Sequence, residues 1–204
     1  LTMPIMVYMT TKVVAVSGTA DIGGNIVFGI CVLTLAVFIV ISNSACASTV
    51  SRDGQAAYTM HILPYSVKKQ LLIKLAANSI VTVIPFVISE IVLVATGYLT
   101  VSQFFATLFL LLIFIVAEGF MAVMNDYKSP EYSEYSKGNE GGKNTLFSTL
   151  IGLVVAIIIG LLAILLPFVL SNPEVSYAAL YGVVILYAVI VAIVNRGFFR
   201  RVQR

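Results

Sequence analysis

The sequence predicts an all-α protein, a polytopic membrane helix bundle of about five transmembrane helices with a short amphipathic helix at the membrane surface. Of its 204 residues, 60% are hydrophobic and only 10% are charged, and the charges gather in short segments between long apolar runs. A water-soluble domain carries roughly 25% charged residues to cover its surface. Apolar runs of ~20 residues are what a helix needs to cross ~30 Å of hydrocarbon. We therefore interpret residues 1–204 as a single transmembrane domain.

The expected elements follow in order from these runs. Residues 1–9 are apolar and are interpreted as the outer end of a further span, so the chain is expected to be a fragment that lacks its N-terminal part. A loop rich in Thr, Ser and Gly is expected from Thr10 to Gly24. The five complete spans are expected at about 26–44, 75–97, 102–124, 146–170 and 177–194.

Local signals within these segments predict how the helices begin and pack. Ser66 is an expected N-cap for the helix that leads into the second span. Pro85 should kink that span, which could serve as a hinge or be tolerated by packing alone. Gly152, Ala156 and Gly160 recur every four residues in the fourth span and predict a close approach to a neighbouring helix.

The basic residues predict the orientation. If segment 51–74 is cytoplasmic, alternation places 125–144 and 195–204 on the same side. Lys12 is then the one basic residue on the opposite side. The cytoplasmic side holds Arg52, Lys68, Lys69, Lys74, Lys128, Lys137, Lys143, Arg196, Arg200, Arg201 and Arg204. This excess follows the positive-inside rule, so we expect a multi-pass protein of the cell membrane with a cytoplasmic C-terminus.

Two carboxyl groups fall inside the expected spans, Glu90 in the second and Glu118 in the third. Each could line a substrate path or couple two helices, or could be bonded to a neighbouring helix without a further role. Glu90 falls in the outer half of its span, whereas Glu118 is eight residues before Asp126 and so about 12 Å from the inner edge. This difference in depth argues against an acid–base pair.

The sequence predicts no catalytic, cofactor-binding or metal site. His61 is the single histidine, and it has no Cys or acidic residue at the spacing of a metal ligand. Residues 137–144 resemble a phosphate-binding loop only superficially, because Lys137 stands where the first Gly is required and Asn144 replaces the Ser or Thr. The chain is therefore expected not to be an enzyme, and neither a nucleotide nor a nucleic acid is an expected ligand.

The segment after the first span has a distinctive order. Residues 51–58 read Ser-Arg-Asp-Gly-Gln-Ala-Ala-Tyr, residues 62–66 read Ile-Leu-Pro-Tyr-Ser, and Lys74 opens the next span. This order resembles the cytoplasmic segment of the permease subunits of type-2 ABC (ATP-binding cassette) exporters. The family often has Glu where Asp53 stands, and a Thr after the Gly where this chain has Gln55. A weaker similarity lies at residues 126–130, an Asp and then a Pro after a span.

The resemblance implies six spans, of which the first would be the incomplete one here, in a transport protein of a bacterial cell membrane. In the family this segment forms a coupling helix that docks on an ABC ATPase subunit, which binds and hydrolyses the ATP. A second permease copy or a related permease is the other implied protein partner, with membrane lipids around both. The implied docking residues are Arg52, Asp53, Gly54, Tyr58, His61, Leu63 and Pro64.

Other functions stay open on the sequence. A membrane-embedded binding or assembly subunit, including a substrate-capturing component of an importer, would share the span pattern. An intramembrane enzyme is less favoured, because it requires paired polar residues at one depth. Segment 51–74 could also be an amphipathic helix that simply binds anionic lipid.

Overall fold

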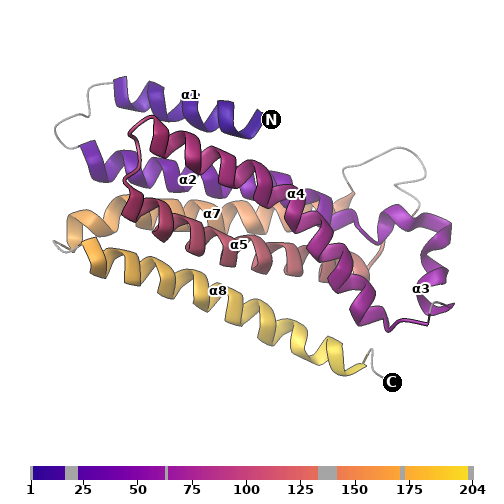
Figure 1. Ribbon diagram of the computed structural model, residues 1–204. Coiled ribbons are helices and arrows are strands. Elements are labelled where there is room, and N and C mark those ends of the chain that lie inside the picture. Colours follow the sequence, from indigo (N-terminus) through magenta and orange to yellow (C-terminus); the bar gives the residue numbers. More distant parts are fainter. Residues whose placement is uncertain (1, 17–22, 63, 133–141, 171–172, 202–204) are drawn as a thin grey trace.

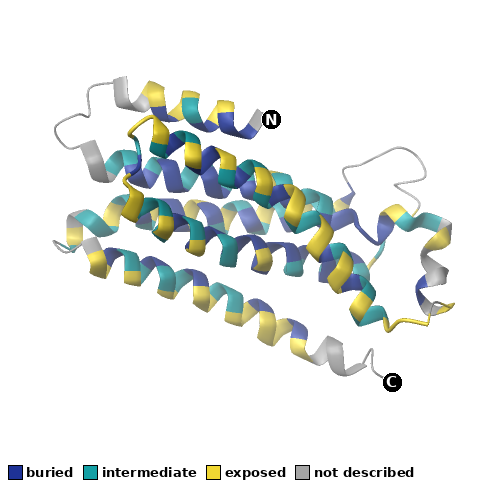
Figure 2. Cartoon of the chain, viewed as in Figure 1, coloured by how far each residue is buried: buried dark blue, intermediate teal, exposed yellow. Residues whose placement is uncertain are grey.

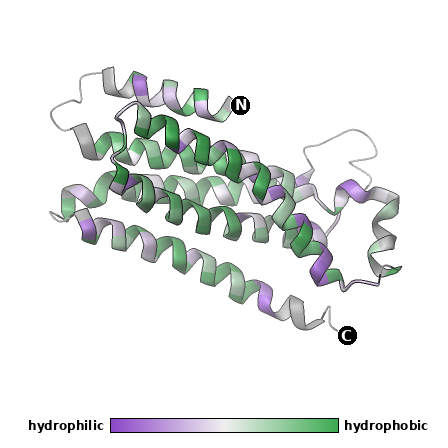
Figure 3. Ribbon diagram, in the orientation of Figure 1, coloured by the Kyte–Doolittle hydropathy of each residue, from purple (hydrophilic) through white to green (hydrophobic). Residues whose placement is uncertain are grey.

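The computed structural model describes residues 2–16, 23–62, 64–132, 142–170 and 173–201. Five long helices lie side by side in this part of the chain (Figure 1): α2 Gly23–Asn43, α4 Val67–Ala95, α5 Val101–Lys128, α7 Lys143–Val169 and α8 Pro173–Arg201. Five segments are long and apolar enough to cross a membrane. Figure 3 shows apolar residues along the helices and most hydrophilic residues near their ends. The predicted class, an all-α membrane bundle with five spans, is confirmed.

The helices are longer than the apolar runs. α4 begins at Val67, eight residues before the expected start of the second span, because the Ser66 side chain accepts a hydrogen bond from the Lys69 N–H at 3.4 Å. Its 29 residues span roughly 44 Å, which exceeds the ~30 Å of hydrocarbon. The first turns of α4 therefore extend into water, and the predicted N-cap at Ser66 is confirmed.

The turn between α4 and α5 is set by two local features. Gly97 has a φ of 79°, a left-handed conformation that glycine adopts without a steric penalty. Thr100 and Gln103 then form a capping box, in which each side chain accepts a hydrogen bond from the other's backbone N–H. This tight turn makes α4 and α5 antiparallel neighbours, as the short connection predicts.

The N-terminal helix α1 runs from Thr2 to Val16 and packs against α2 and α4. The prediction of a loop that begins at Thr10 is therefore wrong for residues 10–16, which are helical. Thr10 and Thr11 continue the helix because their hydroxyl groups donate to the carbonyl oxygens of Met6 and Val7, one turn earlier. The hydroxyl groups are thus satisfied inside the helix, and threonine does not end it.

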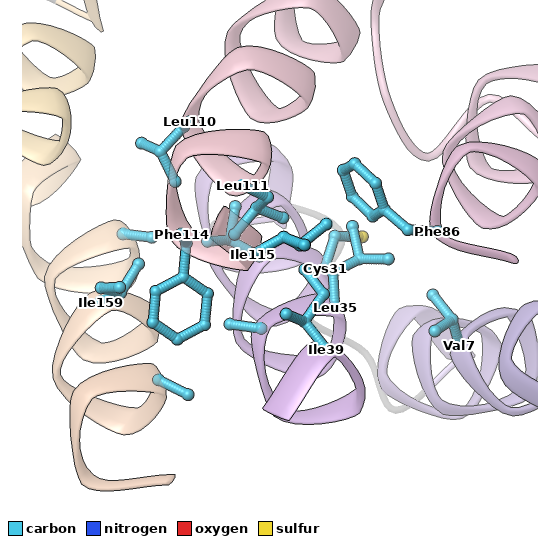
Figure 4. Close-up of a cluster of buried hydrophobic side chains, with 14 of the residues drawn as sticks. Val7, Cys31, Leu35, Ile39, Phe86, Leu110, Leu111, Phe114, Ile115 and Ile159 are labelled. Atoms are coloured by element: carbon cyan, nitrogen blue, oxygen red, sulfur yellow. The ribbon is translucent and has the colours of Figure 1, made fainter. Parts of the chain in front are cut away.

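The core lies around α2 and α5, which are more deeply buried than the other spans (Figure 2). Figure 4 shows its centre, where Leu35 of α2, Phe86 of α4 and Ile159 of α7 gather around α5. From α5, Leu111, Phe114 and Ile115 are fully buried in the same cluster. The outer faces of α4, α7 and α8 instead present exposed Ile, Leu and Val side chains, as lipid-facing helices do.

Glycines let α2 and α7 come unusually close. A Cβ atom on Gly160 would lie 2.5 Å from the Cβ of Leu33, and one on Gly29 would lie 2.8 Å from the Cα of Ile164. Gly152 meets Val40 and the Glu118 carboxyl in the same way. The predicted close packing of the small-residue stripe of α7 is therefore present, and α2 is the helix that it approaches.

Residues 44–62 connect α2 to α4 and are called the linking segment below. They comprise the 3-10 helices η1 Ser44–Ser48 and η2 Ser51–Tyr58 and the short helix α3 Thr59–Ile62. Gly54, with φ 53° and ψ −126°, interrupts η2. The short amphipathic helix expected in this region is therefore divided into pieces by a kink, because only glycine adopts this backbone conformation at little cost.

Candidate functional site

The polar residues of the chain concentrate at one end of the bundle, where the linking segment meets α4 and α5. The linking segment lies at this end together with the C-terminal end of α8 (Figure 1). A second apolar cluster lies beneath it, in which Cys46, Val50 and Met60 pack against Leu71 of α4 and Met124 of α5. The segment is thus folded onto the bundle by its own apolar residues.

Asp126, near the end of α5, holds the start of η2. Its side chain is fully buried, and its Oδ2 atom accepts hydrogen bonds from the N–H groups of Val50 at 2.6 Å and Ser51 at 3.0 Å. The Ser51 hydroxyl donates to Oδ1 of the same carboxyl group and accepts from the Glu131 N–H at 2.9 Å. One carboxyl group therefore satisfies three donors at a helix start that would otherwise be buried without partners.

A second set of hydrogen bonds joins this region to α4. They are made by three polar side chains of α4, which are named the polar ladder here. Lys74, Asn78 and Thr82 are spaced one turn apart and so lie on one face of α4. Lys74 pairs with Asp53 and donates to the Thr49 carbonyl oxygen at 3.3 Å, and Asn78 donates to the Thr49 hydroxyl at 2.7 Å.

The ladder continues into the bundle through Asn43, at the end of α2. The Thr82 hydroxyl donates to Oδ1 of Asn43 at 2.9 Å, and Nδ2 of Asn43 donates to the Ile115 carbonyl oxygen of α5 at 3.0 Å. The end of α2 is therefore joined to the middle of α4 and to the middle of α5 by hydrogen bonds between buried groups. Gln70 adds a further link, because its Nε2 atom donates to the carbonyl oxygens of Met60 and Tyr65.

The residues that the sequence assigned to docking divide into two groups. Asp53 turns toward the bundle and pairs with Lys74, and each side chain keeps between a quarter and a third of its surface exposed. Arg52 and Pro64 are exposed, and Gly54 makes the kink. Leu63 lies outside the described residues, and so do the side chains of Tyr58 and His61. Docking by these seven residues stays a prediction.

Two exposed apolar side chains extend this surface. Ile62, at the end of α3, is 71% exposed, and Tyr65 is 57% exposed. Both precede α4 and so lie outside its apolar run. Tyr132, which follows α5, is also exposed and lies near two of the acidic groups of this region. Burial raises the pKa of its phenol, and the nearby Asp126 and Asp53 carboxylates raise it further. Among the described residues, this end of the bundle thus exposes apolar and basic side chains, whereas Asp126 is buried and Asp53 is partly buried.

The two intramembrane carboxyl groups are both buried and lie at different depths. Glu118 accepts a hydrogen bond from the Tyr187 hydroxyl of α8 at 2.6 Å, so it couples α5 to α8. Glu90 lies near Thr107 of α5, and its two oxygens have no hydrogen-bond partner among the described residues. Thr107 precedes Glu118 by 11 residues on α5, which places the carboxyl groups about 16 Å apart along the helix axis.

Several residues of the site follow from no motif in the sequence. Asn43, Thr49 and Ser51 read as ordinary small polar residues near a span end, and their partners are far away in the chain. The one-turn spacing of Lys74, Asn78 and Thr82 is the signal that predicts a polar face on α4. Within the described part of the chain, no three His, Cys, Asp or Glu side chains lie close enough to hold a metal ion.

Comparison with known proteins gives no match to a family model, to a curated protein or to a solved structure.

Proposed function

We propose that the chain is the permease subunit of an ABC-type exporter, and that its linking segment docks on a separate ATPase subunit. The observation that carries the proposal is the way this segment is held. It lies at the end of the bundle, and Asp126 and Lys74 bond it to α5 and α4. A force applied to the segment would therefore reach two spans directly, which is what a transporter driven by a soluble motor requires.

The surface of the segment supports docking by a protein. Ile62 in the segment and Tyr65 just after it offer exposed apolar area, and Arg52 adds an exposed cation. Apolar, aromatic and arginine side chains are the residue types enriched in the centres of protein interfaces. Because residues 51–66 resemble the coupling segment of type-2 exporters, an ABC ATPase is the partner that we propose. ATP would be bound and hydrolysed there, and a second permease would complete the pathway.

The proposal is tested by purifying the tagged full-length protein from cells that express its neighbouring genes. An ABC ATPase should copurify, and the complex in proteoliposomes should hydrolyse ATP and export a substrate. The proposal fails if no ATPase copurifies and if an added ATPase gives no ATP-dependent export. A subunit that captures substrate for an importer would instead bind its ligand without the ATPase.

Substitution of the exposed residues should separate docking from folding. Ile62→Glu and Arg52→Glu should each weaken ATPase association about tenfold or more in a pull-down titration, because each places a charge in the proposed interface. Val101→Glu is the matched control, since Val101 is 63% exposed at the opposite end of the bundle. Unchanged association of both variants, or an equal loss in the control, would contradict docking at this surface.

The proposed orientation gives a second prediction. With Cys31 and Cys46 replaced by Ala, Asn139→Cys and Gln203→Cys should stay unlabelled by an impermeant maleimide in intact cells and react after lysis. Glu174→Cys, on the opposite side and exposed, should react in intact cells. The excess of Lys and Arg on one side is the physical reason. Labelling of position 139 or 203 in intact cells would reverse the topology and remove the linking segment from the cytoplasm.

A further inference from the structure

A groove of about 480 Å³ runs between α5 and α8. Five residues of α5 between Leu112 and Phe120 line one wall, and Ala188, Val191 and Ala192 of α8 line the other. Every lining residue is apolar. Ala117, Ala188 and Ala192 are among the lining residues, and their methyl side chains leave space that larger ones would fill.

The groove opens toward the part of the surface that faces lipid. Val116 on its α5 wall is 54% exposed, and the neighbouring Val189 and Ile193 of α8 are exposed as well. Along α5 the lining extends from Leu112 to Phe120, which is eight helical rises or about 12 Å. One leaflet of a bilayer contributes ~15 Å of hydrocarbon, so the length of the groove matches that of a single acyl chain.

Two cations lie at one end of the groove. Arg196 is one turn beyond Ala192 and two turns beyond Ala188, so it continues the stripe of α8 that lines the groove. Lys128 of α5 reaches the same level, because its Nζ atom donates to Oδ1 of Asn195 at 2.8 Å. Both cations are exposed.

Asn195 joins α5 and α8 next to these cations, because it accepts the hydrogen bond from Lys128. It is 3% exposed; its Nδ2 atom donates to the Val191 carbonyl oxygen of α8 at 2.9 Å, and its Oδ1 atom accepts from Lys128 of α5. The Lys128 ammonium group keeps further N–H donors beside the one bonded to Asn195, and both Lys128 and Arg196 are exposed. An anionic group at this level would meet two positive charges.

We infer that the groove is a binding site for an anionic phospholipid, with one acyl chain between α5 and α8 and the phosphate group at Lys128 and Arg196. This site does not depend on the proposed transport function. The cations distinguish a lipid from a partner helix: a helix would need only the apolar walls, whereas a phospholipid needs an apolar slot one leaflet long with positive charge at its headgroup end. Both parts of that requirement are present at one place.

The test compares two lipids that differ only in the headgroup. Native mass spectrometry of the full-length protein in detergent should show that phosphatidylglycerol binds about tenfold more tightly than phosphatidylcholine with the same acyl chains. Arg196→Gln should lower the phosphatidylglycerol affinity about fivefold and leave phosphatidylcholine binding unchanged, since one headgroup contact is worth about that much. Lys69→Gln, which removes an exposed cation of α4 at the same end of the bundle, should have no effect.

The apolar part of the site is tested separately. Ala188→Leu fills the groove and should weaken binding of both lipids at least fivefold, whereas Ala178→Leu, an exposed position of α8 outside the groove, should not. Equal binding of the two lipids, or equal effects of Arg196→Gln and Lys69→Gln, would overturn the headgroup assignment. A dimer that is lost in Ala188→Leu and is not displaced by phosphatidylglycerol would overturn the lipid assignment and identify the groove as a contact between two copies.

Discussion

Asp126→Ala is expected to lower the free energy of unfolding by about 3 kcal/mol, because it leaves the N–H groups of Val50 and Ser51 and the Ser51 hydroxyl without an acceptor. These donors are buried, so water does not replace the lost carboxyl group at low cost. Unfolding in mixed micelles, followed by circular dichroism, measures the change. Hydrogen exchange should accelerate at Val50 and Ser51 in particular, since the start of η2 loses its cap.

Asp53→Ala is the matched control for this variant. It removes the same type of side chain from the same region, but its ion pair with Lys74 is partly exposed, and such pairs contribute roughly 0–1 kcal/mol. The control should therefore change the free energy of unfolding by less than a third as much. If the two variants are equally stable, the buried carboxyl group does not hold the linking segment in the way described above.

Gly29→Ala is expected to cost at least about 2 kcal/mol of stability, although alanine is the better helix former. The added methyl group would lie 2.8 Å from the Cα and N atoms of Ile164, and backbone atoms cannot move aside as a flexible side chain can. The α2–α7 contact would have to open along its length. The same micelle unfolding experiment gives the change in free energy, and a fall in the yield of folded protein is the qualitative counterpart.

Gly182→Ala adds the same methyl group to α8, where no atom lies within 4 Å of the new Cβ. Its stability should equal that of the unsubstituted protein or exceed it slightly, because alanine favours the helix. The two substitutions thus have opposite expected signs. A Gly29→Ala protein as stable as Gly182→Ala would show that α2 and α7 do not approach each other closely.

The spans, the Ser66 cap and the small-residue face of α7 could be predicted because each depends on local signals. An apolar run of ~20 residues forms a helix in a membrane whatever its neighbours are. A Ser before a helix predicts an N-cap, and a small residue at every fourth position predicts close helix packing. Each of these signals is contained in one or two helical turns. These features therefore need no knowledge of which helices are neighbours.

The partners across the bundle could not be predicted in the same way. Asp126 and Ser51 are 75 residues apart, and neither segment has a sequence pattern that identifies the other as its partner. Asp53 and Lys74 are likewise 21 residues apart, and the backbone conformation of Gly54 between them is one that no sequence pattern predicts. The helical course of Thr10–Val16 depends on hydroxyl groups that bond within their own helix, whereas threonine in a sequence also suits a loop. The assignment of function stays a proposal.

The polar ladder divides α4 into two mechanically different halves. Up to Thr82, its side chains are fastened to α2 and to the linking segment, so this half must follow any displacement of them. Three residues later Pro85 lacks an N–H group, and the carbonyl oxygen of Val81 loses its usual partner in the helix. The energy needed to bend α4 is therefore lowest at Pro85. A force on the linking segment would therefore move the half of α4 before Pro85 together with α2, and the half after Pro85 could change its angle to it.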